Sequence, residues 1–293
     1  MVEVIVSESL ARAGESTGTE GRLDLSVVAD GGIAVIQRLY QQAPLRALFP
    51  HPEFGEPLTA VLVNSSGGVV GGDRLTVEVE ACDRAEILVT GQAAEKVYRS
   101  AGRDATVTTT LSARLGAFVE FLPQGTIVYD GARLRRVTTI DIAPTARVMA
   151  GDALSLGRVA RGERFTSGLL HDEWRVRVDG RLVWADALHL SDVGGAGISA
   201  SLDSPAGFAG NSGYATFVYA AADASRRLES ARRLLGDAPP AVRAGATSFE
   251  GLLVARWLGP DMEVVRSALG RFWASFRVEV GGRPQRTPTI WNI

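Results

Sequence analysis

Turn-forming residues interrupt the chain at short intervals, and this feature limits its possible folds most. Over residues 22–190, short apolar runs alternate with Gly, Asp, Asn or Pro. Residues 75–81 show the pattern well, because Val77 and Val79 alternate with Glu78, as in a strand with one face buried. The segment is therefore predicted to hold about a dozen strands spaced by roughly 8–15 residues, which is typical of a sandwich, barrel or β-helix.

Several dipeptides mark the expected connections between these strands. Gly31-Gly32 and Asp179-Gly180 each separate two apolar runs and favour a tight turn. Asp130-Gly131 lies between residues 126–129 and 133–142, so we expect a third hairpin there. The sequence shows no internal repeat of the length that solenoid proteins use, so a β-helix here would need irregular coils.

The residue composition changes along the sequence, and four segments are predicted. Residues 1–21 are polar and read as a flexible leader, and residues 22–190 form the β-rich body. Residues 191–213 are rich in Gly and Ser and read as a loop or linker. Residues 214–293 form a C-terminal α+β portion packed on the body.

The C-terminal portion is predicted to carry two helices. Residues 223–235 place Leu and Ala side chains on one helical face, and Asp261 can cap a second helix. Strands are expected at residues 214–220, 242–248 and 251–258. The fold class is therefore mainly β, with an irregular β-helix-like or sandwich-like body and a small C-terminal α+β part.

Composition excludes several classes of function. A net charge of −2 and a pI of about 6.0 do not suit a protein that binds nucleic acid or an acidic membrane. Cys82 is the single cysteine, so no disulfide can form within the chain. No apolar run approaches the ~20 residues of a membrane span, and the N-terminal residues do not resemble a signal sequence, so we expect a cytoplasmic protein.

Common catalytic and metal-binding motifs are missing. The sequence has no P-loop and no G-x-S-x-G elbow, and the glycine block at residues 67–72 precedes a strand-like run rather than a helix. His51, His171 and His189 are far apart in sequence and have no metal-ligand spacing. Each is therefore expected to lie on the surface or to form a hydrogen bond, and no permanently bound cofactor is expected.

Five carboxylates are the candidate functional groups, because they stand at a glycine block, beside a lysine or within apolar strands. They are Asp73, Glu95, Glu120, Asp152 and Asp186. One interpretation is that each faces water or pairs with an arginine. The other is that several line an interior polar channel. A pair acting in glycoside hydrolysis is a third, but no spacing in the sequence supports it.

Five strings occur in a fixed order. They are residues 64–75 (NSSGGVVGGDRL), 91–100 (GQAAEKVYRS), 122–132 (LPQGTIVYDGA), 156–165 (LGRVARGERF) and 288–291 (PTIW). Together they resemble the urease accessory protein UreD (UreH) family over roughly residues 22–293. The motif residues that carry the resemblance are Gly67, Gly68, Gly71, Gly72, Lys96, Tyr98, Arg99, Gln124, Gly157 and Arg158.

The chain departs from the family pattern at two places. The family commonly has a His-Pro-Pro-like lead into the glycine block, where this chain has Asn64-Ser65-Ser66. The position before Lys96 is often Ser or Thr in the family, and here it is Glu95. This chain therefore has no hydroxyl group at that position, although a carboxylate still suits a cation path.

The resemblance implies a non-enzymatic role in urease maturation. Proteins of this family bind apo-urease and the accessory protein UreF, which recruits the GTPase UreG with its nickel. The family fold is similar to an irregular β-helix, and a channel through it is thought to carry Ni²⁺ in transit. Because nickel prefers imidazole and thiolate to isolated carboxylates, the five carboxylates suit passage of the ion better than its storage.

Two other functions fit the residues alone. A generic β-rich binding or scaffold protein would show no specific affinity for urease or UreF. A carbohydrate-active enzyme would need two carboxylates at acid/base distance in an open cleft. The segments 191–213, 223–235 and 284–293 are candidate partner surfaces, although the two helices can equally serve to cover the β core.

Overall fold

In the computed structural model, which describes residues 3–7, 18–194, 197–249 and 251–292, the strands form two sheets. In spatial order, the first, sheet A, holds β1 (Glu3–Ser7), β3 (Ile33–Gln42), β2 (Glu20–Asp30), β6 (Arg74–Ala81), β9 (Ala105–Ala113), β12 (Arg133–Ile142), β14 (Leu169–Val178) and β15 (Arg181–Ser191). Sheet B holds β17 (Arg243–Phe249), β18 (Leu252–Gly259), β16 (Gly213–Ala220), β13 (Arg147–Leu156), β10 (Phe118–Leu122), β7 (Glu86–Gly91), β5 (Leu58–Asn64) and β4 (Leu45–Leu48). The short strands β8 (Glu95–Val97) and β11 (Thr126–Val128) pair in parallel with each other, and β11 pairs with β13.

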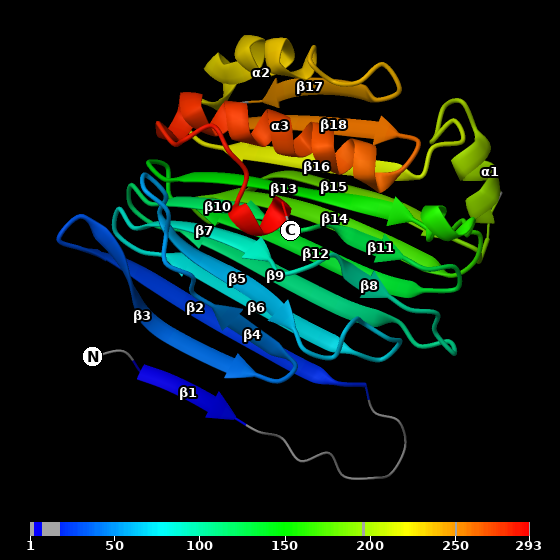
Figure 1. Cartoon of the computed structure of the whole chain (residues 1–293), viewed down its shortest axis with the longest axis horizontal. Helices are drawn as coiled ribbons and strands as arrows, with labels where there is room; N and C mark the ends of the chain where they lie inside the picture. Colours follow the sequence, from blue (N-terminus) through cyan, green and yellow to red (C-terminus); the bar gives the residue numbers. More distant parts are fainter. Residues whose placement is uncertain (1–2, 8–17, 195–196, 250, 293) are drawn as a thin grey trace.

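The middle of the molecule is a stack of coils (Figure 1). The chain passes from β6 in sheet A to β7 in sheet B, then to β9, β10, β12, β13 and β14, and it alternates between the sheets at each step. Each strand pairs in parallel with the strand of the preceding coil, as β9 does with β6 and β10 does with β7. The mainly β, solenoid-like fold class is thus confirmed, with β-hairpins at both ends of the stack.

The two sheets differ in how they are covered, and the sequence reflects this. Strand β6 of sheet A alternates between buried and exposed or half-buried positions, because its outer face meets solvent. All five residues of β10 are buried, since sheet B has a core on each face. A sheet buried on both sides requires nearly continuous apolar strands, which is why residues 118–122 read FVEFL.

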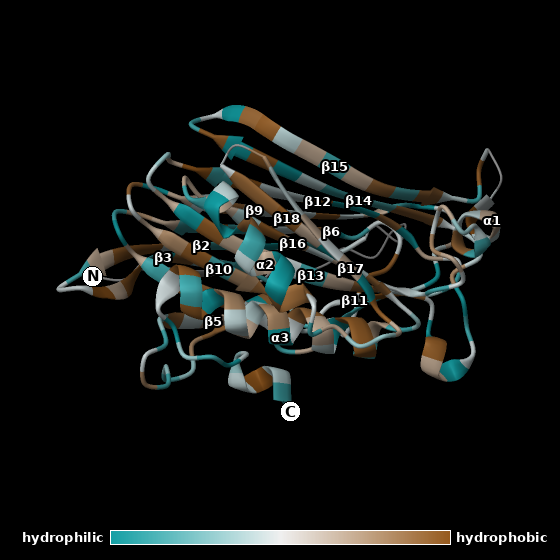
Figure 2. Cartoon of the chain, turned by 90° about the horizontal axis from the view of Figure 1, so that it is seen from above, coloured by the Kyte–Doolittle hydropathy of each residue, from teal (hydrophilic) through white to brown (hydrophobic). Residues whose placement is uncertain are grey.

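Helices cover the outer face of sheet B. Helix α3 (Met262–Gly281) packs on β13, β16 and β18, and α2 (Leu228–Leu235), which follows the 3-10 turn η2 (Ala224–Arg227), packs beside it. Figure 2 shows these helices on the side of the molecule opposite to β14 and β15. Asp261 caps α3 as predicted, because its side chain accepts a hydrogen bond from the backbone N–H of Val264 at 2.9 Å.

The C-terminal portion continues sheet B. Strand β16 pairs antiparallel with β13, β18 with β16, and β17 with β18. Sheet B therefore runs through both the body and the C-terminal segment. After α3, the chain returns over sheet B and ends in the short 3-10 turn η3 (Thr289–Asn292), whose Trp291 is buried.

Two expectations differ from the structure. The Asp130-Gly131 hairpin is wrong: β11 lies in sheet B and β12 in sheet A, so the turn carries the chain between sheets. The segment expected as a linker contains α1 (Gly197–Asp203), whose Ile198 and Leu202 are buried in the core between the sheets. Because small residues surround this helix, the sequence alone does not show that Ile198 and Leu202 belong to the core.

The N-terminal leader lies partly outside the described residues, namely at positions 1–2 and 8–17. Between them, β1 pairs in parallel with β3. The predicted hairpins at Gly31-Gly32 and Asp179-Gly180 are confirmed by the antiparallel pairs β2–β3 and β14–β15. In the described part of the chain, no helix has the length and apolar character required to cross a membrane.

Candidate functional site

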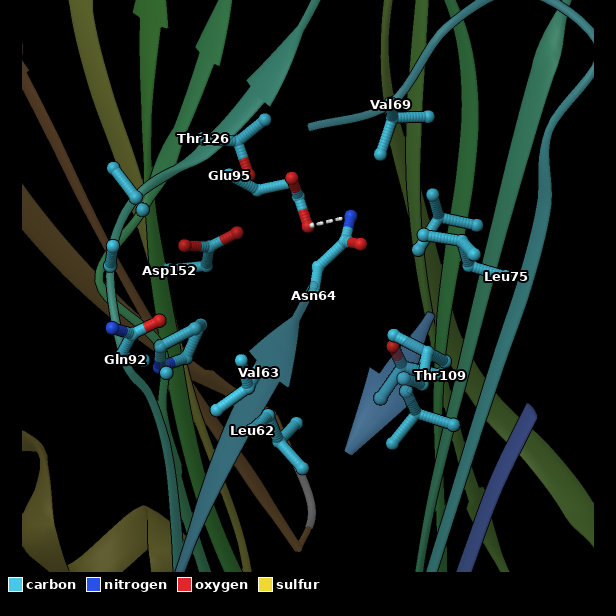
Figure 3. Close-up of a pocket in the computed structure, with 18 of the residues that line it drawn as sticks. Leu62, Val63, Asn64, Val69, Leu75, Gln92, Glu95, Thr109, Thr126 and Asp152 are labelled. Carbon is cyan, nitrogen blue, oxygen red and sulfur yellow. Dashed lines mark hydrogen bonds between the residues drawn. The ribbon is translucent and has the colours of Figure 1, made fainter. Parts of the chain in front are cut away.

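A cavity of about 310 Å³ lies between sheets A and B. Its walls are mostly apolar and include Val69, Leu75 and Thr109 (Figure 3). Two of the candidate carboxylates, Glu95 and Asp152, also line it and project from the sheet B side. The cavity is therefore an apolar chamber with two carboxylates, and parallel coils place their side chains in it although they are far apart in sequence.

Glu95 begins the short strand β8 and is half-buried. Its Oε2 accepts a hydrogen bond from Nδ2 of Asn64 at 3.1 Å, and its Oε1 accepts one from the backbone N–H of Lys96 at 3.2 Å (Figure 3). Burial raises the pKa of Glu95 above its ordinary value, although the Asn64 hydrogen bond acts in the opposite direction. These neutral donors orient the carboxylate and leave it able to exchange ligands.

Asp152 faces the same cavity, but an arginine holds it. Arg136 of β12 reaches across from sheet A and donates to Oδ2 of Asp152 and, at 2.9 Å, to Oγ1 of Thr126. Its Nε donates to Oδ1 of Asp172 at 2.7 Å. Burial raises the pKa of Asp152, while Arg136 opposes this shift. Since burying unpaired charges is costly, the Asp152–Arg136–Asp172 cluster links the two sheets as a unit.

Asp73, Glu120 and Asp186 do not line this cavity. Asp73 closes the glycine block, where its two oxygens accept hydrogen bonds from the backbone N–H groups of Thr19 and Val70 at 2.8 and 2.9 Å. Asp186 of β15 pairs with Arg256 of β18, which joins the two sheets at one end of the stack. The structure therefore brings together two of the five candidate carboxylates.

Glu120 lies on the other face of sheet B, beneath α3. Its two oxygens accept from Nε and Nη2 of Arg277, each at 2.9 Å. Glu56 accepts from the same guanidinium at 2.8 and 2.7 Å, and Arg286 also donates to it at 3.0 Å. Burial raises the pKa of Glu120; at Glu56, the two arginines outweigh burial and lower the pKa.

A second cavity of about 620 Å³ lies between the segment that follows β4 and the C-terminal residues. His51, Glu53 and Glu56 line it on one side, and residues 286–290 line it on the other. Gln92, which follows β7, lines both this cavity and the first one. Gln92 is therefore a lining residue that the two cavities share.

The motif residues gather in the turns at one end of the coils. The Tyr98 hydroxyl donates to the Gly67 carbonyl at 3.0 Å, and its ring meets Tyr129 edge-on at 5.0 Å. Arg158 lies over the Tyr129 ring at 4.5 Å and pairs with Glu163. Single bridges link Val69 to Val97 and Arg99 to Ala132, so each string contacts the string of the next coil.

The remaining motif residues have structural contacts. Arg99 donates to Asp130 at 3.0 Å, and Gln124 donates to the carbonyl of Ile290 at 2.8 Å, which ties the C-terminal string to the coils. Gly67 and Lys96 line the first cavity beside Glu95. Three of the five strings, residues 64–75, 91–100 and 122–132, line the first cavity, and residues 288–290 line the second.

Sequence reasoning missed several residues of these sites. Arg136 is not among the predicted residues, although it stands at an inward position of β12 between Leu134 and Thr138, and that alternation is a usable signal. His171 and His189 are far apart in sequence, but the β14–β15 register places them opposite each other. Asn64, which departs from the family pattern, is the residue that orients Glu95.

The sequence profile of the family described as UreD urease accessory protein matches residues 19–292. Similar proteins named urease accessory protein UreD include one from Magnetococcus marinus, 42% identical over 95% of this chain and 96% of its own length. Another, from Azorhizobium caulinodans, is 40% identical over 93% of this chain and 96% of its own length. The chain belongs to the UreD family. The resemblance inferred from the five strings is thereby confirmed.

A third UreD relative, from Xanthobacter autotrophicus, is 43% identical over 88% of this chain and 87% of its own length. These relatives match nearly full length, so the UreD family covers both sheets and α3 rather than the glycine block alone. Family membership supports a role in urease maturation.

Proposed function

We propose that this protein assists nickel insertion into apo-urease by giving Ni²⁺ a path through its β body. In this proposal it binds UreF directly, reaches the GTPase UreG through UreF, and contacts apo-urease, all in the cytoplasm. Its membership of the UreD family supports the assembly role. The observation that carries the path is the pair of cavities that share Gln92, one of which contains the Glu95 carboxylate.

The donor set suits an ion in transit. A conduit must bind its ion weakly enough to release it, and oxygen ligands hold nickel less firmly than imidazole or thiolate. Glu95 is held by neutral donors, so it can accept a cation without first breaking an ion pair. Asp152 already pairs with Arg136, so in this proposal it guides the ion electrostatically. Gln92 lines both cavities, and in this proposal its amide lies on the path between them.

The same geometry supports a non-enzymatic role. An acid/base pair needs two carboxyl groups facing one substrate. Here Arg136 lies between Asp152 and Asp172, and Arg277 lies between Glu56 and Glu120. Of the two carboxylates that line the first cavity, Asp152 is thus committed to a guanidinium, which leaves Glu95 without a second available carboxylate among the lining residues and favours a structural or electrostatic role over acid/base chemistry.

The test is urease activation in a reconstituted mixture of apo-urease, UreF, nickel-loaded UreG, bicarbonate and GTP. Wild-type chain, no chain, Glu95→Gln and Glu80→Gln are compared, and binding to UreF and apo-urease is measured for each variant. Glu80 is the matched control, because it is a carboxylate of β6 that pairs with Arg114 instead of lining the cavity.

Omission of the chain is expected to abolish activation. Glu95→Gln is expected to bind both partners yet slow activation severalfold at limiting nickel, whereas Glu80→Gln behaves as wild type. Normal activation by Glu95→Gln would make the protein a scaffold without a conduit through this cavity. Normal activation without the chain would reject the assembly role itself.

A further inference from the structure

Two histidines meet on the outer face of sheet A, away from both cavities. His171 of β14 and His189 of β15 are directly opposite each other in the antiparallel register. Their Nδ1 atoms are 3.3 Å apart, and their rings are inclined by 66° with centroids 5.5 Å apart. The two nitrogens therefore lie close together, although 18 residues separate them in sequence.

A neighbouring carboxylate decides which nitrogen of His171 has a free lone pair. The Nε2 atom of His171 lies 3.4 Å from Oε2 of Glu173, which Arg175 fixes with bonds of 2.6 and 2.9 Å. A carboxylate accepts hydrogen bonds, so it favours the His171 tautomer with the proton on Nε2. The Nδ1 lone pair then points towards His189. Ligating histidines commonly have this arrangement, in which a carboxylate orients the ring from the nitrogen opposite the metal.

We propose that His171 and His189 form a two-imidazole site for a divalent transition-metal ion of the nickel, copper or zinc class. Two nitrogens bound to one such ion at about 2.0–2.1 Å, with tetrahedral or square-planar angles, lie roughly 2.9–3.4 Å apart. The Nδ1 separation falls in that range. The same separation also admits a hydrogen bond between the two rings, and the metal titration below distinguishes that contact from a metal site.

The charges around the pair permit a cation. Arg135 of β12 is the neighbour of His171 on the other side, and its Nε donates to Asp104 at 2.7 Å. Arg175 is engaged by Glu173. The described part of the chain holds no group of three or more His, Cys, Asp and Glu side chains arranged for a metal, so water would complete the coordination. Such a site exchanges its ion readily.

This site is independent of the proposed nickel path. His171 faces outward, whereas the next residue, Asp172, turns inward to Arg136. One sheet therefore separates the metal site from the cavity. The two proposals can fail separately, because metal binding to the isolated chain needs neither urease nor an accessory protein.

The experiment is titration of the untagged full-length chain with NiCl₂ by calorimetry, with Cu²⁺ as a spectroscopic probe. The chain has three histidines, so His51→Ala is a matched control for His171→Ala and His189→Ala. Wild type and His51→Ala are expected to bind one Ni²⁺ at this site. Each of the other two variants is expected to weaken that binding at least about tenfold.

The electron paramagnetic resonance spectrum of the Cu²⁺ complex counts the nitrogen ligands. Two are expected in wild type and one in His189→Gln, a second variant that keeps a polar side chain in the exposed position. Glu173→Gln is expected to lower the Ni²⁺ affinity by about tenfold without changing the nitrogen count, as a positioning residue should.

Other outcomes would overturn the site. One is Ni²⁺ binding that survives both His171→Ala and His189→Ala. Another is a wild-type Cu²⁺ spectrum with fewer than two nitrogens. If Glu95→Gln removes the bound Ni²⁺ and His189→Ala does not, the ion binds in the cavity, and the proposed path stands while this site falls.

Discussion

Arg277 of α3 and Glu120 of β10 are joined by two hydrogen bonds of 2.9 Å, although both side chains are almost completely shielded from solvent. The Arg277 guanidinium also lies over the Trp273 ring at 4.4 Å and donates to Glu56. This pair connects the outermost helix to the middle of sheet B. It gives the apolar α3 interface one defined charged contact.

Replacing Arg277 by Met is expected to destabilise the protein by about 3–5 kcal/mol, because Glu120 would remain buried without its partner. Urea unfolding followed by circular dichroism measures the loss. The double variant Arg277→Met with Glu120→Leu is expected to recover most of it, since no uncompensated charge remains. A loss below about 1 kcal/mol for Arg277→Met would show that water or another cation reaches Glu120.

The stability of the protein should depend on pH through Glu95. Burial raises its folded-state pKa, so between the ordinary carboxyl pKa and the raised value the folded chain binds more protons than the unfolded chain. The free energy of unfolding contributed by this residue therefore falls as pH rises through that window. Glu95→Gln removes the effect, so the variant should gain stability relative to wild type as pH rises.

Urea unfolding of both proteins at a series of pH values from about 4 to 7.5 tests this prediction, since the window begins near the ordinary glutamate pKa. Glu80→Gln is the control for the loss of a carboxylate, because Glu80 pairs with Arg114 on β6 and does not line the cavity. A constant difference between Glu95→Gln and wild type would mean that solvent reaches the carboxylate freely.

The glycine block should tolerate a side chain at Gly67 better than at Gly68. Both have positive φ, at +77° and +153°, but a Cβ on Gly67 meets nothing within 4 Å. On Gly68 it would lie 2.4 Å from the Tyr98 ring and 2.7 Å from the Lys96 carbonyl oxygen. We expect Gly67→Ala to cost about 1 kcal/mol and Gly68→Ala about 2–4 kcal/mol in urea unfolding. Equal losses would show that the Tyr98 ring moves aside.

A large side chain at Gln92 should obstruct the junction between the two cavities. Gln92→Trp is expected to slow urease activation severalfold at limiting nickel while UreF and apo-urease still bind. Gln37→Trp, at an exposed position of β3, controls for the added ring. If activation by Gln92→Trp matched wild type at every nickel concentration, the ion would not pass from one cavity to the other at this residue.

The sequence predicts local structure better than it predicts contacts between coils. The alternation of residues 75–81 and the Asp261 cap depend on neighbours in sequence, and both are found. The hairpin predicted at Asp130-Gly131 is wrong because a turn dipeptide determines the local bend of the chain and not the sheet that the next strand joins. The Asp130 carboxylate instead accepts hydrogen bonds from the backbone of Thr166 and Ser167.

The site was partly predictable for the same reason. The apolar pattern shows which carboxylates interrupt an apolar strand, but not from which face of the sheet each side chain projects. Glu120 and Asp152 both interrupt apolar strands of sheet B, yet one meets Arg277 under α3 and the other meets Arg136 inside. The direction of each side chain follows from the register of the coils, and the sequence has no repeat from which to derive that register.

The burial of sheet B on both faces has a consequence for how the chain is made. Coils joined by neighbouring strands can stack as they leave the ribosome, since each pairs with the one before. Glu120 has no ion-pair partner until Arg277 is synthesised, because Arg277 follows it by 157 residues. Until α3 is synthesised, sheet B presents an apolar face and an unpaired carboxylate to water. The nascent protein therefore stays exposed to aggregation until α3 has been made and has packed on sheet B.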